Sequence, residues 1–115
     1  MGKGFIEYVV ILMNDFTVKN KYLGETVDVD ITILDAEGTA TDASAVTYSV
    51  KDPSRTVLVD DSAATHGVTG NYSVSYTLPL ETTGKIGTYT LSIKVTMASG
   101  EIDVQKTTFN VEASI

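Results

Sequence analysis

The sequence of 115 residues contains no cysteine, no tryptophan and a single histidine. Without cysteine, the chain has no disulfides, no thiolate metal ligands and no cysteine nucleophile. A serine or threonine nucleophile needs a base beside it. The only histidine is His66, which lies after Ser62 in the sequence, and the Gly-x-Ser-x-Gly motif of a nucleophilic serine is absent. We therefore interpret His66 as an ordinary surface residue and predict that the protein is not an enzyme.

Positive charge is also scarce. The eight lysines and arginines are outnumbered by 15 aspartates and glutamates, which gives a formal net charge of −7. A surface of this sign repels the phosphate backbone of nucleic acids and is not attracted to anionic membranes. The charge therefore excludes nucleic acid as an expected partner.

No apolar run is long enough to cross a membrane. The stretch Phe5–Met13, FIEYVVILM, is interrupted by Glu7, whereas a spanning helix needs about 20 apolar residues. A signal peptide would have a longer uncharged core and a small-residue cleavage site. We predict that Phe5–Met13 is a strand of the folded protein and expect no membrane insertion.

The sequence is rich instead in alternation of apolar and polar residues, the pattern of a half-buried β-strand. In each such segment the apolar side chains point to one face and hydroxyl or charged side chains to the other. The clearest segments are Val27–Ile33, Val46–Val50, Tyr72–Leu78 and Tyr89–Met97.

Turn-forming residues separate these segments, at Asp35–Gly38, Lys51–Arg55 and Ala98–Gly100. With Phe5–Met13, Val57–Val59 and a final segment from Ile102, they predict about seven to eight antiparallel strands, typical of an immunoglobulin-like β-sandwich. We expect loops over Asp60–Thr69 and Leu80–Lys85, with at most one helical turn near Ser62–His66. By analogy with other sandwiches, function is expected in the loops.

The final segment changes phase. Ile102 and Val104 have one parity, and Phe109 and Val111 have the other. A β-bulge or kink near Gln105–Lys106 would bring both apolar pairs to one face.

Two segments, GNYSVSYTLP at Gly70–Pro79 and GTYTLSIKV at Gly87–Val95, begin alike. Their tyrosines share parity with apolar neighbours, so displaying the tyrosines would also expose an apolar stripe. We predict that they are buried. The predicted structural residues are Tyr72, Tyr76, Tyr89, Leu91 and Ile93. Tyr89 has the position of a tyrosine corner, in which the phenol bonds to loop backbone.

The order of these motifs resembles the immunoglobulin-like repeats of filamins, macroglobulin-like domains of bacterial surface proteins, and small sandwich proteins of phages and archaeal viruses. The residues that carry the resemblance are Lys51–Ser54, Gly70–Pro79, Gly87–Leu91 and Phe109–Val111. It implies a sandwich without a catalytic constellation or cofactor. Leu91 stands where antibody domains have cysteine, and Thr107-Thr108-Phe109 replaces the Ser-Pro-Phe of filamin repeats, so neither subfamily is assigned.

The expected unit is one domain over residues 1–115. Its N-terminal strand, within residues 1–14, either belongs to its own sandwich or pairs with a neighbouring subunit, because a free apolar strand suits β-augmentation. We expect protein partners, self-association through this strand among them. Two other binding modes stay open. One is calcium at the carboxylates Asp28, Asp30, Asp35 and Asp60-Asp61, and the other is glycans, which the absence of tryptophan disfavours.

The expected function is that of a structural or interaction module. The chain begins with methionine and shows no export signal. A virion component that is assembled inside its host cell would have the same two features. A phage or archaeal-virus structural or decoration protein therefore ranks first. The alternative is an immunoglobulin-like domain of a secreted cell-surface, S-layer, adhesin or pilus protein. The expected location is accordingly the virion or the cell exterior.

Overall fold

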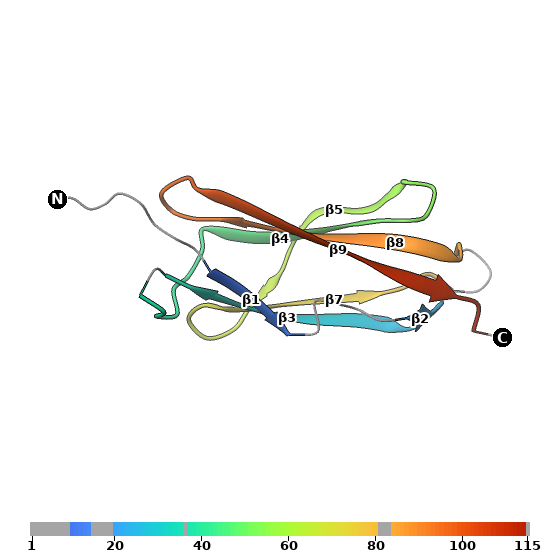
Figure 1. The fold of residues 1–115 in the computed structure, drawn as a ribbon, viewed down its shortest axis with the longest axis horizontal. Coiled ribbons are helices and arrows are strands. Elements are labelled where there is room, and N and C mark those ends of the chain that lie inside the picture. The colour runs from blue at the N-terminus through green and yellow to red at the C-terminus, as the bar shows by residue number, and fades with distance from the viewer. Residues whose placement is uncertain (1–9, 15–19, 36, 81–83, 115) are drawn as a thin grey trace.

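The computed structural model describes residues 10–14, 20–35, 37–80 and 84–114. These residues form two sheets stacked face to face (Figure 1), and no helix occurs among them. The β3–β7 sheet has the order β1-β3-β7-β6, and the β8–β9 sheet has the order β2-β9-β8-β4-β5. The strands are β1 (Val10–Asn14), β2 (Lys21–Tyr22), β3 (Thr26–Leu34), β4 (Ala45–Lys51), β5 (Val57–Ala63), β6 (Thr65–His66), β7 (Asn71–Thr77), β8 (Gly87–Thr96) and β9 (Ile102–Glu112).

The core lies between the two sheets and is built from alternate residues of the central strands. On β3 and β8 every second side chain is buried and the residues between them are exposed or half-buried, as period-two alternation requires. The buried apolar residues are Leu23, Val27, Val29, Ile31, Ile33, Val46, Val50, Tyr72, Val74, Leu78, Tyr89, Leu91, Ile93, Val95, Phe109 and Val111. The predicted all-β, immunoglobulin-like sandwich is confirmed.

The predicted bulge in β9 is wrong. β8 and β9 pair in continuous antiparallel register from Gly87↔Val111 to Thr96↔Ile102. The phase change is accommodated by exposure instead: Phe109 and Val111 enter the core, while Ile102 and Val104 remain 59% and 47% exposed. The outer face of β9 therefore carries apolar side chains at one end.

The predicted loop over Asp60–Thr69 is also wrong for most of its length. β5 continues to Ala63, β6 occupies Thr65–His66, and no helical turn forms there. The chain leaves the β8–β9 sheet after β5 and joins the β3–β7 sheet at β6. Register shifts between β4 and β5 place the irregularity at this edge rather than in β9.

The N-terminal part of the described chain also contributes to both sheets. β1 pairs antiparallel with β3 of the same chain, from Val10↔Leu34 to Asn14↔Asp30. β2 pairs in parallel with the end of β9, at Lys21↔Val111. Of the predicted strand Phe5–Met13, residues 5–9 lie outside the described residues.

The sandwich has two ends, which we name by a residue at each. The Gly70 end contains the turns at Asp35–Gly38, Gly67–Gly70 and Met97–Glu101, and the Tyr89 end contains Tyr22–Glu25 and Asp52–Thr56. β1 begins at the Gly70 end, and β9 finishes at the Tyr89 end (Figure 1). In the described part of the chain, no helix has the length and apolar character to span a bilayer.

Candidate interaction surfaces

Tyr89 ties a loop to the core at the end of the sandwich that bears its name. Its side chain is fully buried, its ring stacks on Phe109 with centroids 5.8 Å apart, and its hydroxyl donates to the carbonyl oxygen of Lys85 at 2.6 Å. Burial raises the pKa of the Tyr89 phenol above its ordinary value of 10.0. This backbone contact is the one expected of a tyrosine corner.

Asp52 organises the neighbouring turn after β4. Its Oδ1 accepts from the backbone N–H groups of Ser54 at 2.8 Å and Thr56 at 2.9 Å, as aspartate does in an Asx turn. Lys85 Nζ lies 3.7 Å from Asp52 Oδ2 and donates to Ser54 Oγ at 2.9 Å. Lys85 thus joins this turn to the loop that Tyr89 holds.

The remaining predicted structural residues lie along the interior. Leu91 and Ile93 are buried in β8, Tyr72 is 8% exposed in β7, and Tyr76 is half-buried. The Tyr72 hydroxyl accepts from the backbone N–H of Ala43 at 3.1 Å. Their side chains lie in or against the core, so they do not assemble into a surface site.

Asp42 joins three segments at the Gly70 end, a role that no pattern in the sequence indicates. Its Oδ1 lies 2.7 Å from the backbone nitrogen of Gly70, which donates to it, and 3.0 Å from His66 Nε2. The His66 ring stacks on Tyr72 with centroids 4.5 Å apart. The Gly70 N–H, assisted by His66, lowers the pKa of Asp42 below its ordinary value of 3.8.

This contact predicts a pH effect at the Gly70 turn. Because the pKa of Asp42 is lower in the folded state, the stabilisation is complete above pH 3.8 and is lost as pH falls through the lowered pKa. The Gly70 amide proton, followed by NMR during an acid titration, should shift with a midpoint below 3.8. The shift should vanish in Asp42→Asn, which keeps the acceptor oxygen but does not titrate. A midpoint at or above 3.8 in the wild-type protein would contradict the assignment.

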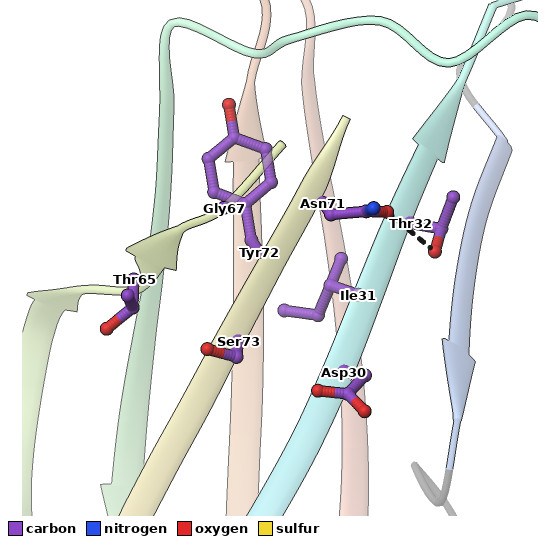
Figure 2. Close-up of a pocket in the computed structure, with 8 residues that line it drawn as sticks. All are labelled: Asp30, Ile31, Thr32, Thr65, Gly67, Asn71, Tyr72 and Ser73. Atoms are coloured by element: carbon purple, nitrogen blue, oxygen red, sulfur yellow. Dashed lines mark hydrogen bonds between the residues drawn. The ribbon is translucent and has the colours of Figure 1, made fainter. Parts of the chain in front are cut away.

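A groove with polar and apolar lining lies on the outer face of the β3–β7 sheet, with a volume of about 340 Å³. Asp30 on β3 pairs with Ser73 on β7, and Ser73 pairs with Thr65 on β6, so their side chains share this face (Figure 2). Thr32 and Asn71 lie beside them and are joined by a 3.3 Å hydrogen bond. Gly67 and the flanks of Ile31 and Tyr72 complete the lining. We call this hollow the Asp30 groove.

The outer face of the β8–β9 sheet carries lysines. Lys51 on β4, Lys94 on β8 and Lys106 on β9 share the outward parity, because the alternate residues Val50, Leu91 and Val95 are buried. We call this surface the lysine face. The hydroxyl residues on it include Thr47, Ser49, Thr90, Ser92 and Thr108. Lys94 pairs with Asp61 at 3.4 Å.

The carboxylates considered for calcium do not converge. Asp28 and Asp30 lie on β3, whereas Asp60 and Asp61 lie on β5 of the other sheet. Asp35 is committed to its own turn, where Oδ1 accepts from the N–H groups of Glu37 and Thr39 at 2.9 Å. In the described residues no group of three or more histidine, cysteine or acidic side chains is placed to hold a metal ion.

Comparison with known proteins supports the fold. No family model matches the chain, and neither does any curated protein. The Lin-41 filamin domain is 20% identical with a TM-score of 0.61, over 90% of this chain and 91% of that domain. CopC from Methylosinus trichosporium OB3b is 15% identical with a TM-score of 0.54, over 84% of this chain and 86% of CopC. A family 123 glycoside hydrolase from Clostridium perfringens is 11% identical with a TM-score of 0.61; the match covers 93% of this chain but 27% of the hydrolase.

These similarities show a filamin-type, immunoglobulin-like sandwich and, at such low identity, the fold alone. The predicted fold resemblance is confirmed. The resemblance to phage and archaeal-virus proteins stays a prediction.

Proposed function

We propose that this protein is a non-enzymatic interaction module that binds other proteins in an assembly through its exposed surfaces. The observation that carries the proposal is that the outer faces of both sheets are free of any covering element in the described part of the chain. One face carries carboxylates and the other carries lysines. The polar groups at the ends, among them Asp42, Asp52 and Asp35, are used to hold turns. The sandwich thus offers surfaces rather than a reaction centre.

The assembly we propose first is a virion of a phage or an archaeal virus, with the chain as a structural or decoration protein. The alternative is a cell-surface, S-layer, adhesin or pilus protein. The described chain starts at one end of the sandwich and finishes at the other (Figure 1). Modules in a linear array are joined in that way, and this is the observation for which we keep the alternative beside the virion role.

Peptide mass spectrometry of a fractionated source culture separates the two. Enrichment of the chain in purified virus particles would support the virion role, and enrichment in the washed cell envelope would support the alternative. Recovery in the soluble cell lysate alone, with no enrichment in either assembly, would contradict both.

We also propose self-association through the N-terminal strand. Because Val10–Asn14 already pairs with β3, the segment offered to a neighbouring subunit is the apolar stretch before Val10, which includes Phe5, Ile6 and Tyr8. An apolar strand can extend the sheet of another subunit through main-chain hydrogen bonds.

Sedimentation velocity of the full chain tests this form of association. The wild-type protein should be larger than a monomer, and Ile6→Glu should dissociate it, because a charge in an apolar contact is costly. Glu7→Gln is the matched control and should sediment as the wild-type protein does. Equal sedimentation of wild type and Ile6→Glu would show that this segment does not join subunits.

A further inference from the structure

We propose that the Asp30 groove binds a primary ammonium group, and that its occupant is the side chain of Lys106 from a second copy of this chain. The copies would stack with the β3–β7 face of one against the lysine face of the next. This inference rests on the proposed interaction function and names a partner for it.

The lining of the groove selects a cation. Asp30 contributes a carboxylate, Asn71 an amide, and Thr32, Thr65 and Ser73 hydroxyl groups, while no lysine or arginine lines the groove. An ammonium group has three N–H donors and no acceptor, so it matches a carboxylate surrounded by acceptor oxygens. A phosphate or carboxylate ligand would be repelled by Asp30.

The Asp30 carboxylate is free to accept hydrogen bonds from a ligand. Among the described residues Asp30 has no hydrogen-bond or ion-pair partner, and its side chain is exposed. Ser73 and Thr65, which follow Asp30 across the strands, likewise have no side-chain hydrogen bond within the described structure. Figure 2 shows Asp30, Ser73 and Thr65 on three neighbouring strands, with the Thr32–Asn71 hydrogen bond toward one end of the groove.

The lysine face supplies a suitable donor. Lys106 is exposed on β9 and has no carboxylate partner among the described residues, whereas Lys94 is engaged by Asp61. The flexible four-carbon stem of a lysine lets the ammonium group reach into a hollow. Around Lys106, the paired residues Ser92 and Ser49 are small, so a second sheet can approach closely.

A second pair of opposite charges supports the same contact. Asp28 lies on β3 beside the groove and is exposed, and it offers a second negative charge to Lys51 of the same neighbour. Each copy carries both the donor and the acceptor face on opposite sides of the sandwich. Such a heterologous contact does not close between two copies, and it produces an open row of subunits.

Charge exchange tests the contact. Full-length wild-type protein, Asp30→Lys, Lys106→Glu and an equimolar mixture of the two variants are compared by sedimentation velocity at about 0.05 M salt, where electrostatic attraction is little screened. We expect each variant alone to associate about tenfold more weakly than wild type, because one reversed charge turns attraction into repulsion. The mixture should recover association, because every contact between the two variants then joins opposite charges. The unchanged Lys106 of one variant faces the unchanged Asp30 of the other, and the two reversed charges face each other. Glu37→Lys, which makes the same charge change in an exposed turn, is the control and should behave as wild type.

The outcomes separate this inference from the broader proposal. A mixture that stays dissociated, or an Asp30→Lys variant that associates as wild type does, would overturn the contact. If the charge variants associate normally while Ile6→Glu does not, the N-terminal strand joins the copies and the groove does not. If the wild-type chain remains monomeric at low salt, both modes of self-association are wrong, although a role with another protein would be unaffected.

Discussion

Replacing Tyr89 by alanine should lower the free energy of unfolding by about 4 kcal/mol, as expected for deletion of a buried aromatic side chain. The ring is fully buried and stacks on Phe109, so the substitution leaves a cavity between the sheets. It also removes the hydroxyl that bonds to Lys85. A loss of this size is a large share of the total stability of a small domain.

Urea denaturation monitored by circular dichroism measures this loss, and Tyr89→Phe separates its two causes. The phenylalanine keeps the ring and removes only the hydroxyl, so it should cost about 1–2 kcal/mol. If Tyr89→Ala were no more destabilising than Tyr89→Phe, the packing of the ring against Phe109 would not contribute as described.

Replacing Gly70 by alanine should destabilise the protein by about 3 kcal/mol through two effects that act together. Gly70 has a φ of 78°, in the left-handed region that side chains disfavour. A Cβ at this position would also lie 3.0 Å from Ala40 Cβ, from the carbonyl oxygen of Ile33 and from the nitrogen of Thr41. Two of these atoms are backbone, so the clash is not relieved by rotating a side chain.

Gly100→Ala is the matched control. Its φ is 96°, also in the left-handed region, but a Cβ there meets nothing within 4 Å. The control should therefore cost only the backbone strain, about 1 kcal/mol. Equal midpoints for the two variants in urea denaturation would mean that the close approach of the chain at Gly70 is not costly.

Most of the fold was predictable because the central strands are half-buried. On β3 and β8 the period of two in the sequence reproduces the period of two in burial, from Val27 to Ile33 and from Tyr89 to Val95. Such strands have one face toward the core and one toward solvent, so the sequence records their orientation directly.

The edges were not predictable in this way. β5 is an edge strand with no buried residue, so its sequence lacks alternation and Asp60-Asp61 resembles a loop. β9 begins with Ile102 and Val104 exposed, and a rule that buries every apolar residue then requires a bulge that does not form. The sequence pattern therefore failed at β5 because an exposed edge strand need not alternate, and at β9 because apolar residues need not be covered.

The Asp30 groove depends on pairings between distant parts of the chain. Asp30, Ser73 and Thr65 share a face because of the register of β3 with β7 and of β7 with β6. The alternation on each strand indicates which residues point outward, but it does not determine the register between strands. Asp42 was missed for the same reason, since its partners Gly70 and His66 lie far along the sequence.

The direction of the chain through the sandwich affects how the protein responds to mechanical tension. The described chain enters with β1 at the Gly70 end and leaves with β9 at the Tyr89 end (Figure 1). A pull on these two points acts along the strands, so the hydrogen bonds between β8 and β9, from Gly87↔Val111 to Thr96↔Ile102, are sheared together rather than opened one after another. The geometry therefore resists stretching along the axis more than peeling from the side.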